Sequence, residues 1–240
     1  MGKVAFVTGA DRGLGYSMTI TLLQEGYSVF AGRYMEDWGS LDEAKKEYGE
    51  KITIVPLDIG SDESVTAALA VVTSMTSHLD LLINNAGITD AKDQATVLDE
   101  MDFEVMSRIY TVNTLGPLRV SHAFMELLLQ GQDKLIVNVS SEAGSIARNQ
   151  RVNMYGYCMS KSALNMQSSI LHQQLRKEGG QVMVYYPGWL KSYMSGTLSE
   201  EALVSPDESA SKLMNLIKNH KSYDRNQPVF LDLDGVEWPW

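Results

Sequence analysis

Short apolar runs alternate with longer amphipathic segments along the whole chain. The apolar runs predict buried parallel strands at 3–8, 27–31, 52–57, 79–83, 135–139, 182–186 and 228–231. The segments between them predict helices. The first ends near residue 25, and the next three cover 36–50, 61–76 and 99–129. The fifth carries residue 157 and ends near 178, and the last begins at 205. Strands that alternate with helices without a linker are typical of one α/β domain, a doubly wound parallel sheet with helices on both faces.

One proline interrupts the helical pattern of 99–129. Pro117 has no N–H, and its ring crowds the carbonyl four residues earlier, which belongs to Asn113. The sequence therefore predicts a break in this helix near 113–117. We expect the Asn113 carbonyl to bind an ordered water and face Lys161; a kink that only fits the helix to the sheet is the alternative.

Composition limits the classes of function. The 240 residues are 44% hydrophobic and carry a net charge of −10, which argues against nucleic acid or an anionic membrane as a partner. No run of 18 apolar residues predicts a membrane span. The single cysteine excludes an internal disulfide and favours the cytoplasm, and the scattered histidines make a metal site improbable.

A glycine-rich turn follows the first strand and precedes a helix. Gly9, Gly13 and Gly15 are spaced G-x-x-x-G-x-G, which differs from the common G-x-G-x-x-G fingerprint but still lets backbone N–H groups approach a pyrophosphate. Arg33 follows the second strand, where an arginine suits the 2′-phosphate of NADP, and Arg12 adds a second cation. Two solvated surface arginines are the alternative.

The chemistry-bearing residues lie later in the chain. Tyr157 and Lys161 are four residues apart and so share one helix face, where an ammonium would lower the pKa of the phenol. Taken alone, such a pair is more often a solvated surface. Ser140 and Ser141 end the fifth strand, and neither lies in the G-x-S-x-G elbow of a serine hydrolase.

Five motifs in order make the chain resemble the short-chain dehydrogenase/reductase family, which has a Rossmann fold. They are Thr8-Gly-Ala-Asp-Arg-Gly-Leu-Gly15, Asn84-Asn-Ala-Gly87, Asn113 with Ser141, Tyr157-x-x-x-Lys161 and Pro187-Gly188. Within the family, Tyr157 to Asn165, Pro187-Gly-Trp189 and the ending Asp234-Gly-x-Glu-Trp-Pro-Trp240 resemble the C-factor and sniffer-type carbonyl reductases. Whether Trp238 and Trp240 cap a substrate cleft or pack on the core is left open.

The resemblance implies a role for each matched residue. Tyr157 is the acid/base, Lys161 lowers its pKa and holds the nicotinamide ribose, Ser141 polarises the carbonyl, and Asn113 supports a proton relay. The implied NADP contacts are Gly9, Arg12, Gly13, Leu14, Gly15, Arg33, Asp58, Ile59, Asn85, Ala86, Gly87, Tyr157, Lys161, Pro187, Gly188 and Ser192. The cofactor half is expected at about 1–135 and the catalytic and substrate-binding half at about 136–240.

The sequence thus predicts an NADP(H)-dependent oxidoreductase that interconverts a small, moderately apolar carbonyl compound and its alcohol. A cofactor-binding regulatory or signalling protein of the C-factor type, with little turnover, is the alternative. A homo-oligomer, dimer or tetramer, is left open.

Overall fold

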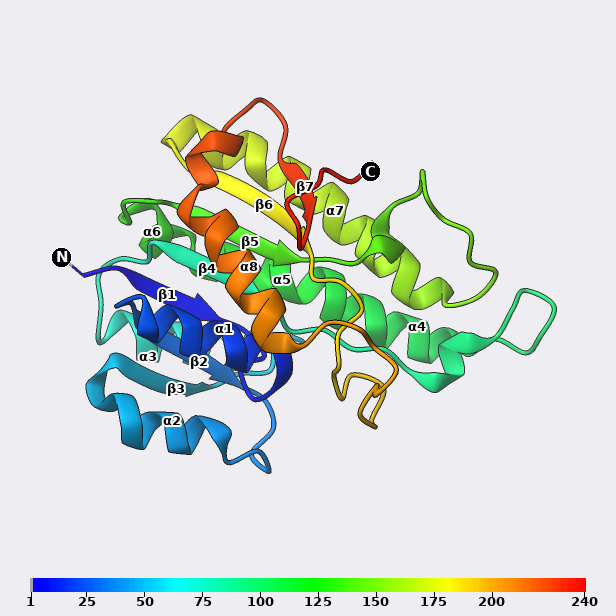
Figure 1. Cartoon of the computed structure of the whole chain (residues 1–240), viewed down its shortest axis with the longest axis horizontal. Helices are drawn as coiled ribbons and strands as arrows, with labels where there is room; N and C mark the ends of the chain where they lie inside the picture. Colours follow the sequence, from blue (N-terminus) through cyan, green and yellow to red (C-terminus); the bar gives the residue numbers. More distant parts are fainter. Residues whose placement is uncertain (1) are drawn as a thin grey trace.

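Seven parallel strands form a single sheet in the order β3-β2-β1-β4-β5-β6-β7, as the computed structural model of residues 2–240 shows (Figure 1). The strands are β1 (Val4–Val7), β2 (Ser28–Arg33), β3 (Ile52–Pro56), β4 (Leu81–Asn84), β5 (Leu135–Val139), β6 (Gln181–Tyr186) and β7 (Val229–Asp232). The strand order reverses between β1 and β4, and in doubly wound sheets ligands bind at the carboxyl edge next to such a reversal. The predicted doubly wound α/β fold is confirmed.

Helices cover both faces of the sheet (Figure 1). One face packs against α1 (Gly13–Gln24), α2 (Ser40–Tyr48) and α8 (Pro206–Lys218). The other packs against α3 (Asp62–Thr73), α5 (Gly116–Ala123), α6 (Met125–Leu129) and α7 (Tyr155–Leu175). Side chains of both strand faces are buried, which explains why the strands are almost continuously apolar in sequence. Within residues 2–240, no helix is long and apolar enough to cross a membrane.

The sequence signals for helix ends operate as expected. The Ser61 hydroxyl accepts the N–H of Ser64 at the start of α3, and the Ser205 hydroxyl accepts the N–H of Glu208 at the start of α8. The second helix begins at Ser40 rather than at residue 36. Residues before it turn instead, because the carboxylate of Asp11 accepts the N–H groups of Tyr34 and Met35 and holds the chain as it leaves β2.

At the predicted break in the segment 99–129 the helix changes type but is not interrupted. After α4 (Phe103–Tyr110) the chain forms one π-helical turn, Thr111–Leu115, before α5 begins. Within this turn, the carbonyl of Thr114 accepts the side-chain amide of Gln167 from α7 at 3.1 Å. The π turn is therefore tied to α7 just before Pro117.

The carboxyl-terminal tail packs on the chain's own core. The Trp238 indole donates to Asp232 at 3.0 Å and meets the Tyr186 ring edge-on at 5.0 Å between centroids. The guanidinium of Arg148 stacks over the same indole. The tail thereby holds the 142–154 loop, in which Ser145 also donates to the carbonyl of Pro239.

Candidate active site

Tyr157 and Ser141 meet beyond the carboxyl end of β5. Tyr157 lies in the first turn of α7, and its phenol lies next to the Ser141 hydroxyl, which lowers the pKa of the phenol. Ser140 points elsewhere, since its hydroxyl donates to the side chain of Asn165 at 2.7 Å inside the core. Of the two serines, only Ser141 is therefore placed to act with Tyr157.

Lys161 is buried one helical turn after Tyr157. Its ammonium donates to the Val139 carbonyl at 2.9 Å and lies 5.8 Å from the centre of the Tyr157 ring. Burial lowers the pKa of Lys161 to about 8 and raises the pKa of Tyr157 to about 12. The expected lowering of the Tyr157 pKa is not found, because burial of the phenol raises this pKa. The contribution of Lys161 to it stays a prediction.

Asn113 connects three parts of the site from within the π turn. Its side-chain oxygen accepts the N–H of Ile88, and its amide donates to the Ile88 carbonyl and to the Ser160 hydroxyl at 3.1 Å. Ser160 in turn donates to the carbonyl of Tyr157 at 2.7 Å. Asn113 thus joins the segment after β4 to the backbone of Tyr157. The relay through its own carbonyl remains a prediction.

Asp93 is a positioning residue that the sequence alone does not reveal. It is fully buried, and its two carboxylate oxygens accept the N–H groups of Gly156 and Tyr157, each at 2.8 Å. Its own carbonyl accepts the N–H of Met154. A carboxylate suits a helix N-terminus, where N–H groups lack helical partners. Sequence patterns near α7 could not identify this cap, because Asp93 is more than 60 residues from the helix that it caps.

Replacing Asp93 by Asn should lower the free energy of unfolding by about 1–3 kcal/mol, since one buried N–H loses its acceptor and faces an amide donor. Asp93→Ala should lower it further, and turnover should fall with it as the start of α7 loosens around Tyr157. Urea unfolding and activity measurements test both. Asp99→Asn, in an exposed loop, is the matched control; an equal effect of the two Asn variants would contradict the assignment.

The glycine turn after β1 is built against the turn after β4. The Thr8 hydroxyl accepts the N–H groups of Asn85 and Ala86, and the Asn85 side chain donates back to the carbonyls of Thr8 and Gly9 at 3.0 Å. Gly15 lies so close that an added Cβ would be 2.1 Å from the Gly9 carbonyl oxygen. Gly9 itself has a φ of +62°.

The two arginines predicted for a 2′-phosphate lie near this turn and already have partners. Arg33 pairs with Asp42 of α2 at 3.0 Å. The guanidinium of Arg12 lies 5.0 Å from the Trp38 ring centre and donates to the Tyr193 carbonyl at 3.3 Å. Arg12 therefore links the turn before α2 to the segment after β6.

The remaining predicted contacts line the same edge of the sheet. Asp58 accepts the N–H of Gly60 at 2.7 Å, and the side chain of Ile59 is buried against Gly116. After β6, Gly188 has a φ of +82° and opens the segment that carries Ser192. Leu14 is buried under the glycine turn, and the Pro187 carbonyl accepts the hydroxyl of Ser209.

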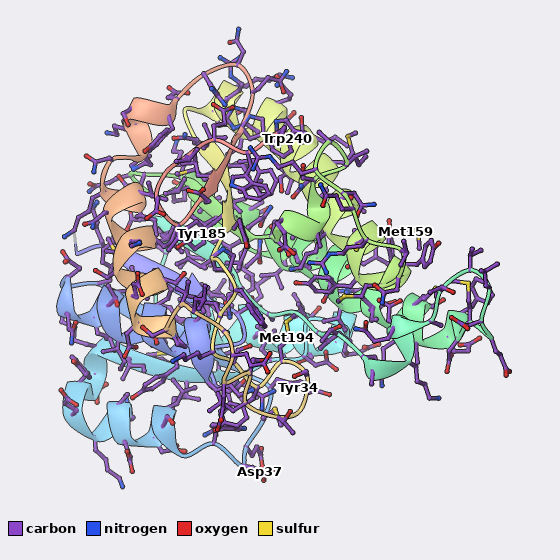
Figure 2. All side chains as sticks on the ribbon, turned by 45° about the vertical axis from the view of Figure 1, so that its right-hand side comes forward. Tyr34, Asp37, Met159, Tyr185, Met194 and Trp240 are labelled. Carbon is purple, nitrogen blue, oxygen red and sulfur yellow. The ribbon has the colours of Figure 1, made fainter. Side chains whose placement is uncertain are left out.

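The open start of α1 and the Lys161 ammonium near Gly87 fit the two ends of a dinucleotide. Gly13 has a φ of +55° and nothing within 4 Å of an added Cβ, so the start of α1 is open to a phosphate. At the other end, a Cβ on Gly87 would lie 3.6 Å from the Lys161 ammonium, 3.3 Å from the Asn113 side-chain oxygen and 3.5 Å from the Met194 methyl group. Figure 2 shows the segment that carries Met194 in front of this edge. Residues 2–240 contain no cluster of three metal-ligating side chains.

Known proteins share this architecture. The family model for short chain dehydrogenases matches residues 3–203. The C-signal protein of Myxococcus xanthus is 36% identical over 165 residues, which cover 69% of this chain and 95% of that protein.

Two solved structures match over the full length. An NADPH-bound carbonyl reductase from chicken fatty liver is 32% identical with a TM-score of 0.84, over 100% of this chain and 99% of the other. The carbonyl reductase Sniffer of D. melanogaster is 25% identical with a TM-score of 0.85, over 100% of both chains. Because the family model covers most of the sequence and the Ser141, Tyr157 and Lys161 side chains meet at one edge of a doubly wound sheet, this chain belongs to the short-chain dehydrogenase/reductase family.

Proposed function

We propose that the protein is an NADP(H)-dependent carbonyl reductase of small, moderately apolar substrates. The observation that carries the proposal is the buried ammonium of Lys161, 5.8 Å from the centre of the Tyr157 ring, with Ser141 next to the phenol. The NADPH-bound carbonyl reductase of similar structure supports the choice of cofactor and reaction.

Each side chain has one task in this reaction. When bound, the nicotinamide supplies or accepts the hydride. Ser141 holds the substrate oxygen, and Tyr157 donates its proton to that oxygen as the alcohol forms. With its pKa raised to about 12, the phenol is protonated at neutral pH. Lys161 keeps two ammonium hydrogens beyond its bond to Val139, and these can hold ribose hydroxyls.

The two halves of the chain divide the work. Residues of about 1–135 would hold the dinucleotide, and about 136–240 would supply the catalytic side chains and the substrate site. The segment after β6, with exposed Trp189 and Leu203, would cover an apolar substrate. The single Cys158, a free thiol, is consistent with action in the reducing cytoplasm. Oxidation of NADPH across a panel of aldehydes, ketones and quinones tests the proposal directly.

Replacing Arg33 by Asp should weaken NADPH binding by about 1–4 kcal/mol, because a guanidinium contact to the 2′-phosphate is lost and a like charge takes its place. NADH, which lacks that phosphate, should bind as before or better. Fluorescence titration with both nucleotides measures the difference. Arg176→Asp, beyond the far end of α7, is the control. A wild-type protein that binds NADH as tightly as NADPH would contradict the cofactor assignment.

A signalling protein that binds the cofactor with little turnover is the second candidate. Its support is the 36% identity to the C-signal of Myxococcus xanthus. The complete set of Ser141, Tyr157 and Lys161 favours the enzyme. Tight NADPH binding without oxidation on any carbonyl of the panel would reverse that preference.

A further inference from the structure

The hydroxyl hydrogen of Ser141 is already donated to a carboxylate. Ser141 donates to Oε2 of Glu142 at 2.6 Å, and the other side of the same carboxylate is bound by the guanidinium of Arg151. A serine hydroxyl has one hydrogen to donate. In the proposed reaction, that hydrogen must turn to the substrate oxygen, so a substrate has to release Ser141 from Glu142.

The negative charge of Glu142 shifts the pKa of two nearby tyrosines, Tyr157 and Tyr186. Burial raises the pKa of Tyr157, and the negative charge of Glu142 raises it further. Burial and the charge of Glu142 also raise the pKa of Tyr186 in β6. Arg151 opposes Glu142 in both cases. The Glu142 side chain is 31% exposed and that of Arg151 is 39% exposed, so the ion pair reaches solvent next to Ser141.

Resting on the proposed function, we propose that Glu142 is a specificity-determining residue that selects carbonyl compounds with a hydroxyl on the neighbouring carbon and rejects those with a carboxylate there. A neighbouring hydroxyl can donate to Glu142 in place of Ser141, which frees the Ser141 hydrogen for the carbonyl. A neighbouring carboxylate cannot donate and brings a second negative charge beside the first.

Four ketones with one aromatic ring test the selection: 2-hydroxyacetophenone against acetophenone, and phenylglyoxylate against its methyl ester. With NADPH, the wild type should show a kcat/KM at least about 10-fold higher for the hydroxyketone than for acetophenone, and for the ester than for the acid. Glu142→Gln keeps an acceptor but removes the charge. In this variant, the ratio of kcat/KM for phenylglyoxylate to kcat/KM for its methyl ester should rise at least about 10-fold. The preference for 2-hydroxyacetophenone over acetophenone should stay.

Two variants separate the charge from a structural effect. Glu142→Ala should also lose the hydroxyl preference, and Arg151→Gln should depress the acid further, because the unpaired carboxylate remains. A variant that only disturbs the loop would lower all four kcat/KM values together and leave their ratios unchanged, which would overturn the inference. Glu126→Gln, an exposed residue of α6, is the control for a lost surface charge.

A binding measurement decides the inference even without turnover. Calorimetric titration of benzoate into the NADPH-loaded protein should give at least about 10-fold tighter binding to Glu142→Gln than to the wild type, whereas benzyl alcohol should bind the two alike. Equal benzoate affinities would overturn the role of Glu142. Failure of the wild type to reduce any of the four ketones, with the benzoate difference present, would count against the reductase and not against Glu142.

Discussion

Tyr157→Phe should reduce turnover on any accepted carbonyl by on the order of 10²-fold or more, because it removes the proton donor and leaves the ring in place. The loss should appear in kcat, with NADPH affinity little changed. The phenol lies next to Ser141, so loss of the hydroxyl should lower the free energy of unfolding by about 1 kcal/mol at most. Steady-state kinetics and NADPH titration of the same preparation measure both.

Tyr155→Phe is the matched control, because Tyr155 lies in the same first turn of α7 but has Met159 rather than a lysine four residues on. Its turnover should stay close to wild type. Near-normal activity of Tyr157→Phe would reject the proposed mechanism, and an equal loss in the two variants would mean that the start of α7, rather than the Tyr157 hydroxyl, is what matters.

Gly15→Ala should abolish useful NADPH binding, with a loss on the order of 10²-fold. The new Cβ would lie 2.1 Å from the Gly9 carbonyl oxygen and 2.5 Å from the Asn85 amide, and neither can retreat easily because Asn85 donates to Gly9. The glycine turn must therefore shift away from the position that receives the phosphates. The overlap should also lower the free energy of unfolding by about 1–3 kcal/mol.

Gly39→Ala provides the comparison for this second prediction. Gly39 has a φ of −72° and nothing within 4 Å of an added Cβ, so alanine fits there without strain. Thermal unfolding and NADPH titration of the two variants separate a general glycine effect from the close approach at Gly15. Full NADPH affinity in Gly15→Ala would contradict the placement of the cofactor at this turn.

The sequence by itself determined the strands, their parallel arrangement and the irregular helical turn before Pro117. These follow from local rules: buried strands require apolar runs, and a proline cannot pair with the carbonyl of Asn113. The glycine turn and the Tyr157–Lys161 spacing were equally local, so the residues placed at one edge of the sheet could be named in advance. The sequence also located the start of α8, because Ser205 and Pro206 are end signals in themselves.

Tertiary structure alone decided what surrounds those residues. The choice between Ser140 and Ser141 depends on Asn165, which takes one hydroxyl into the core. Asp93 reaches the N-terminus of α7 from a distant loop. Burial reversed the expected pKa shift of Tyr157, because desolvation depends on every atom packed around the phenol. Periodicity and spacing report which face of an element is apolar, but partners distant in sequence and the loss of solvent arise only when the elements pack.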